Sequence, residues 1–188
     1  MKGFFWYPAV GILVIIPNII SLHFFKNLNF LAFISGNISL IFHFCFLGIF
    51  IIKTITNKLI HIFLKTFFVI FLCLIIFLLV IKDIKENNRT AFAFANFGLI
   101  FFCIIYYHQL FNNIPILNLK QEPSFWIITG IFFCMSIHIP ILITTDYLRY
   151  QISISNYRLL LSCPLFSYTI MHLFFIKACL CAIHPQRV

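Results

Sequence analysis

The sequence predicts an all-α fold, a polytopic transmembrane helix bundle of about six spans in a single membrane domain over residues 1–188. Of these 188 residues, 63% are hydrophobic and 9% are charged, and the mean hydropathy is +1.08. A water-soluble domain of this size cannot hide so much apolar surface. The apolar residues form runs long enough to cross the hydrocarbon core as helices, without the apolar–polar alternation of a membrane barrel.

The first four spans are predicted over residues 4–23, 28–52, 62–81 and 90–111. The first begins in an aromatic cluster and lacks the cleavage site of a signal peptide, so we expect an uncleaved span. A basic loop over 53–65 and a charged loop over 82–89 connect the following spans. The third span is almost wholly aliphatic and aromatic, which predicts the most lipid-exposed helix, with Phe71 facing lipid.

The later half of the chain is organised around the stretch 117–146. A polar connector ends in Pro123, a residue favoured at the first position of a helix, and leads into a fifth span over 124–145. Trp126 lies at the start of that span, where aromatic residues anchor helices at the membrane surface. The span stops at Asp146, and a sixth span is predicted over 159–183.

Four spans carry a stripe of polar or small residues at helical spacing. Such groups are costly to expose to lipid, so we expect them to face the interior, either as helix-packing contacts or around a ligand cavity. Gly130 and Cys134 form a small-residue pair that allows a neighbouring helix to approach closely. The stripes are Ser35, Ser39 and His43; Asn96, Cys103 and Tyr107; Gly130, Cys134 and His138; and Tyr168 and His172.

The charged residues argue against nucleic acid as a partner and against catalysis. The net charge is +9, but the basic residues lie mostly between the apolar runs, as expected for anchors near anionic lipid headgroups. No hydrolase or nucleotide-binding motif occurs, and we expect no catalytic residue. The acids all lie in loops or at span ends; they are Asp83, Glu86, Glu122 and Asp146.

The cysteines and histidines suggest no metal site and leave one cofactor open. The seven cysteines lie in or beside apolar runs, where they behave as small hydrophobic residues. A membrane haem needs two apposed histidines without fixed spacing, so a haem-binding cytochrome stays a less favoured alternative to a protein without cofactor. The candidate ligands are His43, His108, His138 and His172.

Tyr107, Asn118 and Trp126 are expected to meet at one membrane face. The fourth and fifth spans are antiparallel neighbours across a short connector, so their ends lie on the same side. Asn118 would then cap a helix end or bind a polar ligand group, and the two aromatic rings would form an amphipathic wall. The alternative is that all three residues are interfacial anchors. Basic residues divide almost equally between the two sides, and Lys177 tips the balance toward cytoplasmic termini.

The chain resembles a group of small bacterial multi-spanning proteins similar to the membrane-embedded halves of sensor histidine kinases. The residues that carry the resemblance are Tyr106-Tyr107, Leu117-Asn118-Leu119, the run from Pro123 through Phe125-Trp126 to Gly130, and Cys181. The family type has seven spans and a cytoplasmic C-terminus. By this resemblance the chain lacks the first of those seven spans and begins at the second. The resemblance also implies a polar residue in the last helix, which is His172 here where the family more often has asparagine.

We therefore expect a non-catalytic integral membrane protein, a sensory or accessory component of a membrane signalling system. It would lie in the bacterial inner membrane, with the lipid bilayer and a membrane or cytoplasmic signalling protein as partners. A small transporter or permease-like module is the alternative of a different class. The candidate residues for a cleft or for helix packing are Tyr107, Asn118, Trp126, Gly130, Cys134, His138 and His172.

Overall fold

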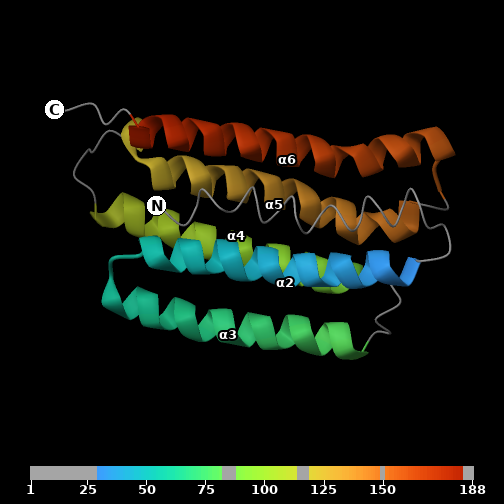
Figure 1. Cartoon of the computed structure of the whole chain (residues 1–188), viewed down its shortest axis with the longest axis horizontal. Helices are drawn as coiled ribbons and strands as arrows, with labels where there is room; N and C mark the ends of the chain where they lie inside the picture. Colours follow the sequence, from blue (N-terminus) through green and yellow to red (C-terminus); the bar gives the residue numbers. More distant parts are fainter. Residues whose placement is uncertain (1–28, 82–87, 114–118, 149–150, 184–188) are drawn as a thin grey trace.

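The computed structural model describes residues 29–81, 88–113, 119–148 and 151–183, and in this part of the chain all regular structure is helical (Figure 1). The predicted first span, 4–23, and Asn118 lie outside the described residues. The elements are α2 (Asn29–Thr54), α3 (Lys58–Ile81), α4 (Arg89–Asn113), a short 3-10 turn η1 (Leu119–Gln121), α5 (Pro123–Leu148) and α6 (Ile154–Ile183).

Each of these five helices is long and apolar enough to cross a membrane. They contain between 24 and 30 residues. At about 1.5 Å per residue, even the shortest exceeds the roughly 30 Å of the hydrocarbon core. By length and composition, the chain is a multi-pass helical membrane protein, and five of the six predicted spans fall within the described residues.

Two helices begin earlier than their apolar runs do. α3 begins at Lys58 rather than at residue 62, and α6 begins at Ile154 rather than at residue 159. At α3 the cause is a cap, because the Asn57 side-chain oxygen accepts hydrogen bonds from the backbone N–H groups of Leu59 (3.0 Å) and Ile60 (3.3 Å). Lys65, predicted to close a loop, therefore lies about two turns inside α3.

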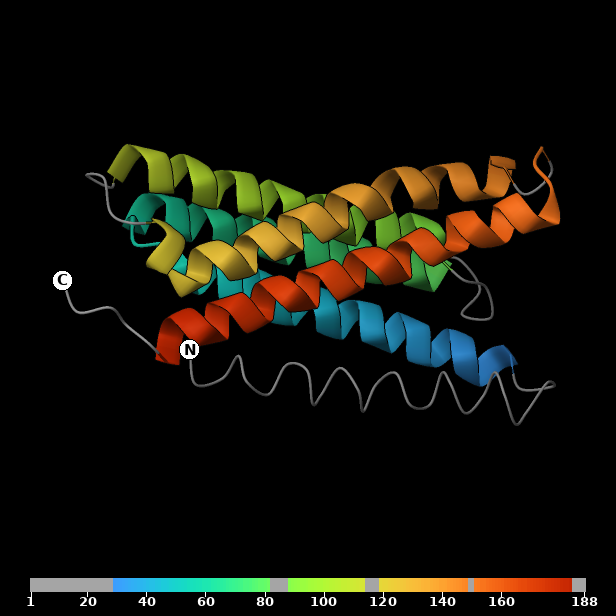
Figure 2. The same ribbon diagram turned by 90° about the horizontal axis from the view of Figure 1, so that it is seen from above.

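α4 is the central helix of the described bundle, because it packs against α2, α3 and α5. α6 packs mainly along α5 and lies at the edge of the bundle (Figures 1 and 2). Successive helices run in opposite directions. One end of the bundle, called here the hairpin end, carries the α2–α3 turn, the α4–α5 connection and the last turn of α6, at the left of Figure 1.

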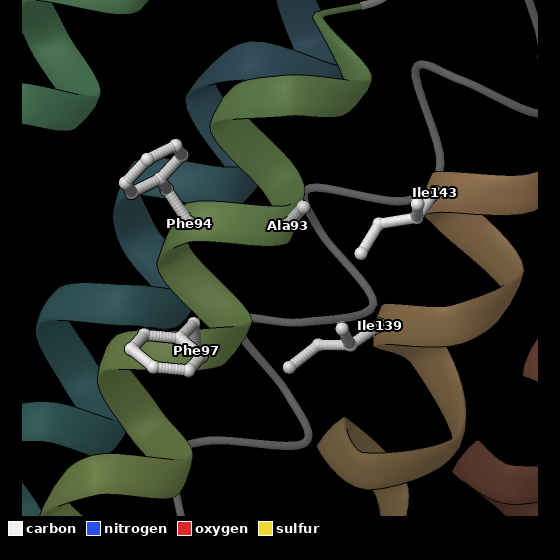
Figure 3. Close-up of a pocket in the computed structure, with 5 residues that line it drawn as sticks. All are labelled: Ala93, Phe94, Phe97, Ile139 and Ile143. Carbon is white, nitrogen blue, oxygen red and sulfur yellow. The ribbon is translucent and has the colours of Figure 1, made fainter.

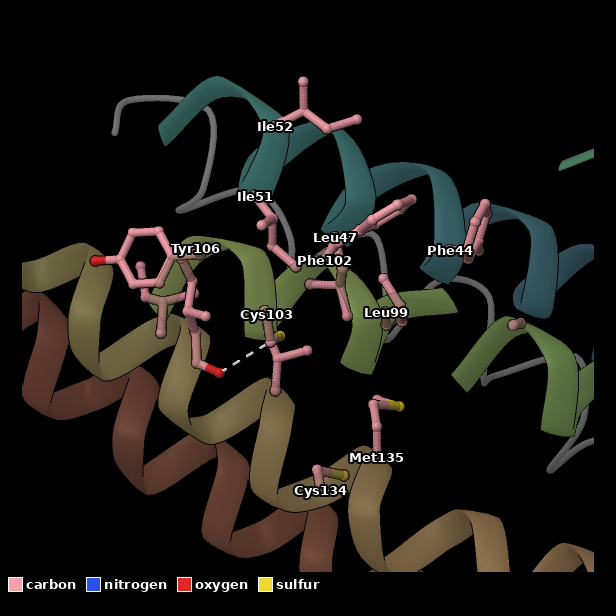
Figure 4. Close-up of a cluster of buried hydrophobic side chains, with 14 of the residues drawn as sticks. Phe44, Leu47, Ile51, Ile52, Leu99, Phe102, Cys103, Tyr106, Cys134 and Met135 are labelled. Atoms are coloured by element: carbon pink, nitrogen blue, oxygen red, sulfur yellow. Dashed lines mark hydrogen bonds between the residues drawn. The ribbon is translucent and has the colours of Figure 1, made fainter. Parts of the chain in front are cut away.

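Phenylalanine rings fill the interface between α2, α3 and α4. Phe44 and Phe68 stack with ring centroids 5.3 Å apart, and both rings contact Phe102 of α4. Figure 4 shows Phe44 and Phe102 within the buried cluster. Gly48 leaves room for this stack, because a Cβ there would lie 2.9 Å from Phe68 Cε2. These contacts join the three helices through apolar packing.

α3 has the smallest buried share of the five described spans, 17%, which confirms the prediction that it is the most lipid-exposed. The expectation that Phe71 faces lipid is wrong. A Cβ on Gly98 of α4 would lie 2.9 Å from Phe71 Cδ1, and the Phe71 ring contacts Phe102. Phe71 falls at helical spacing with the buried residues Leu64 and Ile75, on the narrow inward face of an otherwise exposed helix.

The topology can be tested by cysteine labelling. Asn57 lies in the turn at the hairpin end, and Gln151 lies in the α5–α6 connection at the other end; both are exposed. In a variant without the native cysteines, single cysteines at these positions should react from opposite sides of the membrane. With cytoplasmic termini, only the cysteine at position 151 should react from outside. Labelling of both from one side would contradict a spanning bundle, and labelling of position 57 alone from outside would reverse the orientation.

Candidate functional site

The α5–α6 interface combines small, polar and large apolar residues. The buried residues of α6 in this interface recur at helical spacing and are Ser167, Met171, Phe175 and Ala178. On α5, Gly130 permits the close approach: a Cβ there would lie 2.8 Å from Phe174 Cβ and 3.3 Å from the Met171 backbone oxygen. Close backbone approach at small residues is the usual basis of helix association in lipid.

One helical turn or more beyond Gly130, polar side chains of α5 and α6 meet and form what we call the polar cluster: Cys134, His138, Ser167, Tyr168 and the carbonyl of Pro164. Ser167 Oγ lies 3.1 Å from His138 Nε2 and 3.5 Å from Cys134 Sγ. Ser167 and Cys134 are fully buried and His138 nearly so. The cluster thus joins the two helices by hydrogen bonds inside the apolar bundle.

The positions of the protons in the polar cluster follow from which atoms can accept a hydrogen bond. The Pro164 carbonyl only accepts, so Ser167 Oγ donates to it at 2.8 Å. The serine oxygen is then an acceptor for the N–H of His138 Nε2, which also lies 3.4 Å from the Pro164 oxygen. His138 Nδ1 faces Cys134 Sγ at 4.0 Å. The serine proton therefore points to a backbone carbonyl rather than to the histidine, unlike the arrangement of a serine nucleophile and its base.

Tyr168 connects the polar cluster to α2. Its ring lies 4.6 Å from the His138 ring, and the His43 ring meets it edge-on at 6.0 Å. The two histidines thus contact the same phenol ring. His43, His138 and Tyr168 all lie close to the middle residue of their helices, away from both helix ends.

The predicted stripe of α6 is displaced by one residue from its buried face. His172 is exposed, and its Nδ1 donates a hydrogen bond to the Tyr168 carbonyl at 2.6 Å. One residue corresponds to about 100° around a helix, so the inward face passes through Ser167 and Met171 instead. α6 packs mainly against α5, so the buried strip on it is narrow.

Tyr107 lies in the α4–α5 interface near the hairpin end. Its hydroxyl donates a hydrogen bond to Thr129 Oγ1 at 2.9 Å, and its ring contacts those of Phe125 and Phe132. Cys103, one turn earlier on α4, donates a weak hydrogen bond to the Ile128 carbonyl at 3.9 Å (Figure 4). These contacts attach α5 to the centre of the bundle.

Trp126 lies on the other side of α5, toward α6. Its ring stacks on that of Phe174 at 5.9 Å, and Lys177 Nζ lies 5.9 Å from the centre of the indole. A cation over an indole ring is a favourable contact. Tyr107 and Trp126 therefore take part in two different helix interfaces at the hairpin end. The cleft with Asn118 stays a prediction, because Asn118 lies outside the described residues.

Polar residues that the sequence did not single out also join the helices. Ser167 carries the polar cluster, and its signal was its spacing of four residues from Cys163 and Met171. Gln109 Nε2 donates to Thr56 Oγ1 at 2.7 Å and ties α4 to the α2–α3 turn. Asn88 Nδ2 donates to the Leu78 carbonyl and its Oδ1 accepts from Ala91 N–H, so it caps α4 against α3.

An apolar cavity of about 280 Å³ opens between α4 and α5, away from the hairpin end. Its walls are Ala93, Phe94 and Phe97 of α4 and Ile139 and Ile143 of α5, and Figure 3 shows the two isoleucines pointing toward α4. A cavity with such walls suits a hydrocarbon chain. It is separate from the polar cluster, which lies on the α6 side of α5.

Among the described residues, no group of three or more His, Cys, Asp or Glu side chains is arranged to hold a metal ion. Comparison of the chain with protein-family models, with curated proteins and with solved structures found no match. The resemblance to the membrane-embedded halves of sensor histidine kinases stays a prediction.

Proposed function

We propose that this chain is a non-catalytic component of a membrane signalling system, sensory or accessory, in the bacterial inner membrane. The observation that supports this most is the polar cluster, in which Ser167 and His138 join the edge helix α6 to α5. Polar residues at membrane depth are expensive to bury and mark functional positions more often than other residues do. α6 lies at the edge of the described bundle and packs mainly against α5, so it can shift along α5 when a partner or ligand binds.

The energy scale of the polar cluster suits such a switch. Interhelical hydrogen bonds in membranes contribute about 0.6 kcal/mol on average and up to about 1.7 kcal/mol. Signals commonly rely on coupling free energies of about 1–3 kcal/mol. Rearranging the His138–Ser167 and Cys134–Ser167 contacts is therefore within reach of one ligand or one partner. On this proposal the α5–α6 pair transmits a change to a membrane or cytoplasmic signalling protein.

A small transporter is the second candidate, and two prolines favour it. Pro140 in α5 and Pro164 in α6 lie at similar distances from the middle of their antiparallel helices, both away from the hairpin end. Each proline removes a backbone hydrogen bond and frees a carbonyl one turn earlier. Both helices continue through their prolines, and apolar helices weakened by proline beside a polar cluster are a feature of transport sites.

A gene deletion with complementation distinguishes the two. Deletion should change the transcripts of a confined gene set, and the wild-type chain should restore them. The variant His138→Leu should insert normally without restoring them, because it removes the contact to Ser167. His108→Leu is the matched control, since His108 is exposed on α4. Equal restoration by both variants would contradict a signalling role for the polar cluster.

A change in solute uptake without a transcript change would favour the transporter, and a Soret band on purification would favour a cytochrome.

A further inference from the structure

We infer that the groove between α2 and α3 at the hairpin end binds the headgroup and upper acyl chain of an anionic phospholipid. The groove has a volume of about 420 Å³ and opens beside the α2–α3 turn. One face of each helix supplies its walls. The lining residues are Ile49, Ile52 and Lys53 of α2 and His61, Lys65, Phe68 and Val69 of α3.

Basic residues contribute to both walls of this groove. Lys53 is in the last turn of α2, and His61 and Lys65 are one turn apart on the facing side of α3. No carboxylate forms an ion pair with either lysine among the residues that the structure describes. The accessible lining of the groove is almost wholly apolar, so the two lysines contribute their aliphatic stems to the walls and keep their ammonium groups outside the groove. Two lysines and a histidine around one apolar groove match the charge of a lipid phosphate and its hydrogen-bond acceptors.

The depth of Lys65 points to a membrane ligand rather than to a soluble anion. Lys65 lies seven residues after the first residue of α3, about 10 Å along the helix axis. A lysine at that depth extends toward the membrane surface, where lipid headgroups lie. A phospholipid bound there would have its phosphate near the headgroup level and its acyl chain beside the helices.

The lower part of the groove is apolar and well supported. Ile49 and Val69 are exposed on the lipid side, whereas the ring of Phe68 is held by stacking on Phe44 at 5.3 Å and by its fit against Gly48. Free phosphate makes no use of such walls, but an acyl chain that continues from the headgroup gains apolar contact along them. The combination of cations above and aliphatic walls below therefore selects a phospholipid.

Native mass spectrometry of the full chain in a neutral detergent tests this inference, with phosphatidylglycerol, phosphatidylcholine and inorganic phosphate as probes. Phosphatidylglycerol should bind more tightly than phosphatidylcholine. Lys65→Gln should weaken phosphatidylglycerol binding about fivefold, as expected for one lysine near an anionic surface. Lys58→Gln is the matched control: Lys58 is exposed on the same helix near the same end but does not line the groove. It should change binding less than twofold.

Val69→Trp tests the apolar wall without changing charge, and it should weaken phosphatidylglycerol binding by narrowing the groove. Inorganic phosphate at millimolar concentration should not displace the lipid. Equal effects of Lys58→Gln and Lys65→Gln would reduce the site to general surface charge and overturn the inference. Equal binding of phosphatidylcholine and phosphatidylglycerol would also overturn it. The same holds if phosphate displaces the lipid and Val69→Trp binds phosphatidylglycerol as the wild type does. Unchanged melting temperatures in detergent alone will establish that the variants are folded.

Discussion

Gly130→Leu is expected to lower the stability of the α5–α6 pair by about 1–3 kcal/mol, the usual cost of overpacking a close contact. A Cβ at this position would already lie 2.8 Å from Phe174 Cβ and 3.3 Å from the Met171 backbone oxygen. Neither is the flexible end of a side chain, so α6 itself must move. Thermal unfolding in detergent, followed by circular dichroism, measures the loss as a lower midpoint.

Gly36→Leu is the matched control for this prediction. Gly36 lies in α2, and a Cβ there would meet nothing within 4 Å. The substitution adds the same side chain to a helix of similar length, so the intrinsic preference of leucine for helix cancels in the comparison. A substitution at Phe71 cannot serve as the control, although the sequence predicts that this residue faces lipid, because Phe71 packs against Gly98. If the two glycine variants unfold at the same temperature, the close approach of α6 at Gly130 is refuted.

The second large effect is expected from the polar cluster, measured as a double-mutant cycle. His138→Leu and Ser167→Ala each remove one partner of the 3.1 Å contact and leave the other buried. Each single change should cost about 0.5–1.5 kcal/mol, the net contribution of one hydrogen bond, because Ser167 still donates to the Pro164 carbonyl and His138 Nε2 still lies 3.4 Å from it. The double variant should cost less than the sum, with a coupling of about 0.6–1.7 kcal/mol for an interhelical hydrogen bond in a membrane.

Thr169 provides the control for this cycle. It is exposed on α6, and its hydroxyl donates to the Leu165 carbonyl of the same helix at 3.0 Å. His138→Leu combined with Thr169→Ala should therefore be additive within about 0.5 kcal/mol. Unfolding in mixed micelles with increasing denaturing detergent gives the free energies. Additivity at Ser167 as well would mean that the hydrogen bond between α5 and α6 contributes nothing to stability.

Some residues of the site could be predicted from the chain and others could not. Gly130 and Cys134 stand out because a small-residue pair four apart has one obvious use in a membrane helix. Ser167 was missed because the sequence of α6 offers several polar residues on different faces, among them Ser162, Thr169 and His172. Only contact with α5 distinguishes them: Ser167 is buried against it, while the other three are exposed.

The groove beside Lys65 could likewise be predicted only in part from the sequence. Charge patterning identified a basic loop over 53–65, but the cap at Asn57 converts much of it into the first two turns of α3. Lys65 thereby lines the same groove as Lys53 instead of lying in a loop. The sequence contained both lysines, and the helix start decided how they are placed.

By itself the sequence determined the membrane class of this protein, its helical fold and the approximate limits of the five described spans. These follow from local hydrophobicity, because an apolar run without water must satisfy its backbone within one helix. The tertiary structure alone decided which faces meet: Phe71 against Gly98, Ser167 against His138, and His172 outward. In lipid both sides of a helix are apolar, so hydrophobic periodicity does not identify the buried face. Shape complementarity and hydrogen bonds to neighbouring helices decide which face is buried.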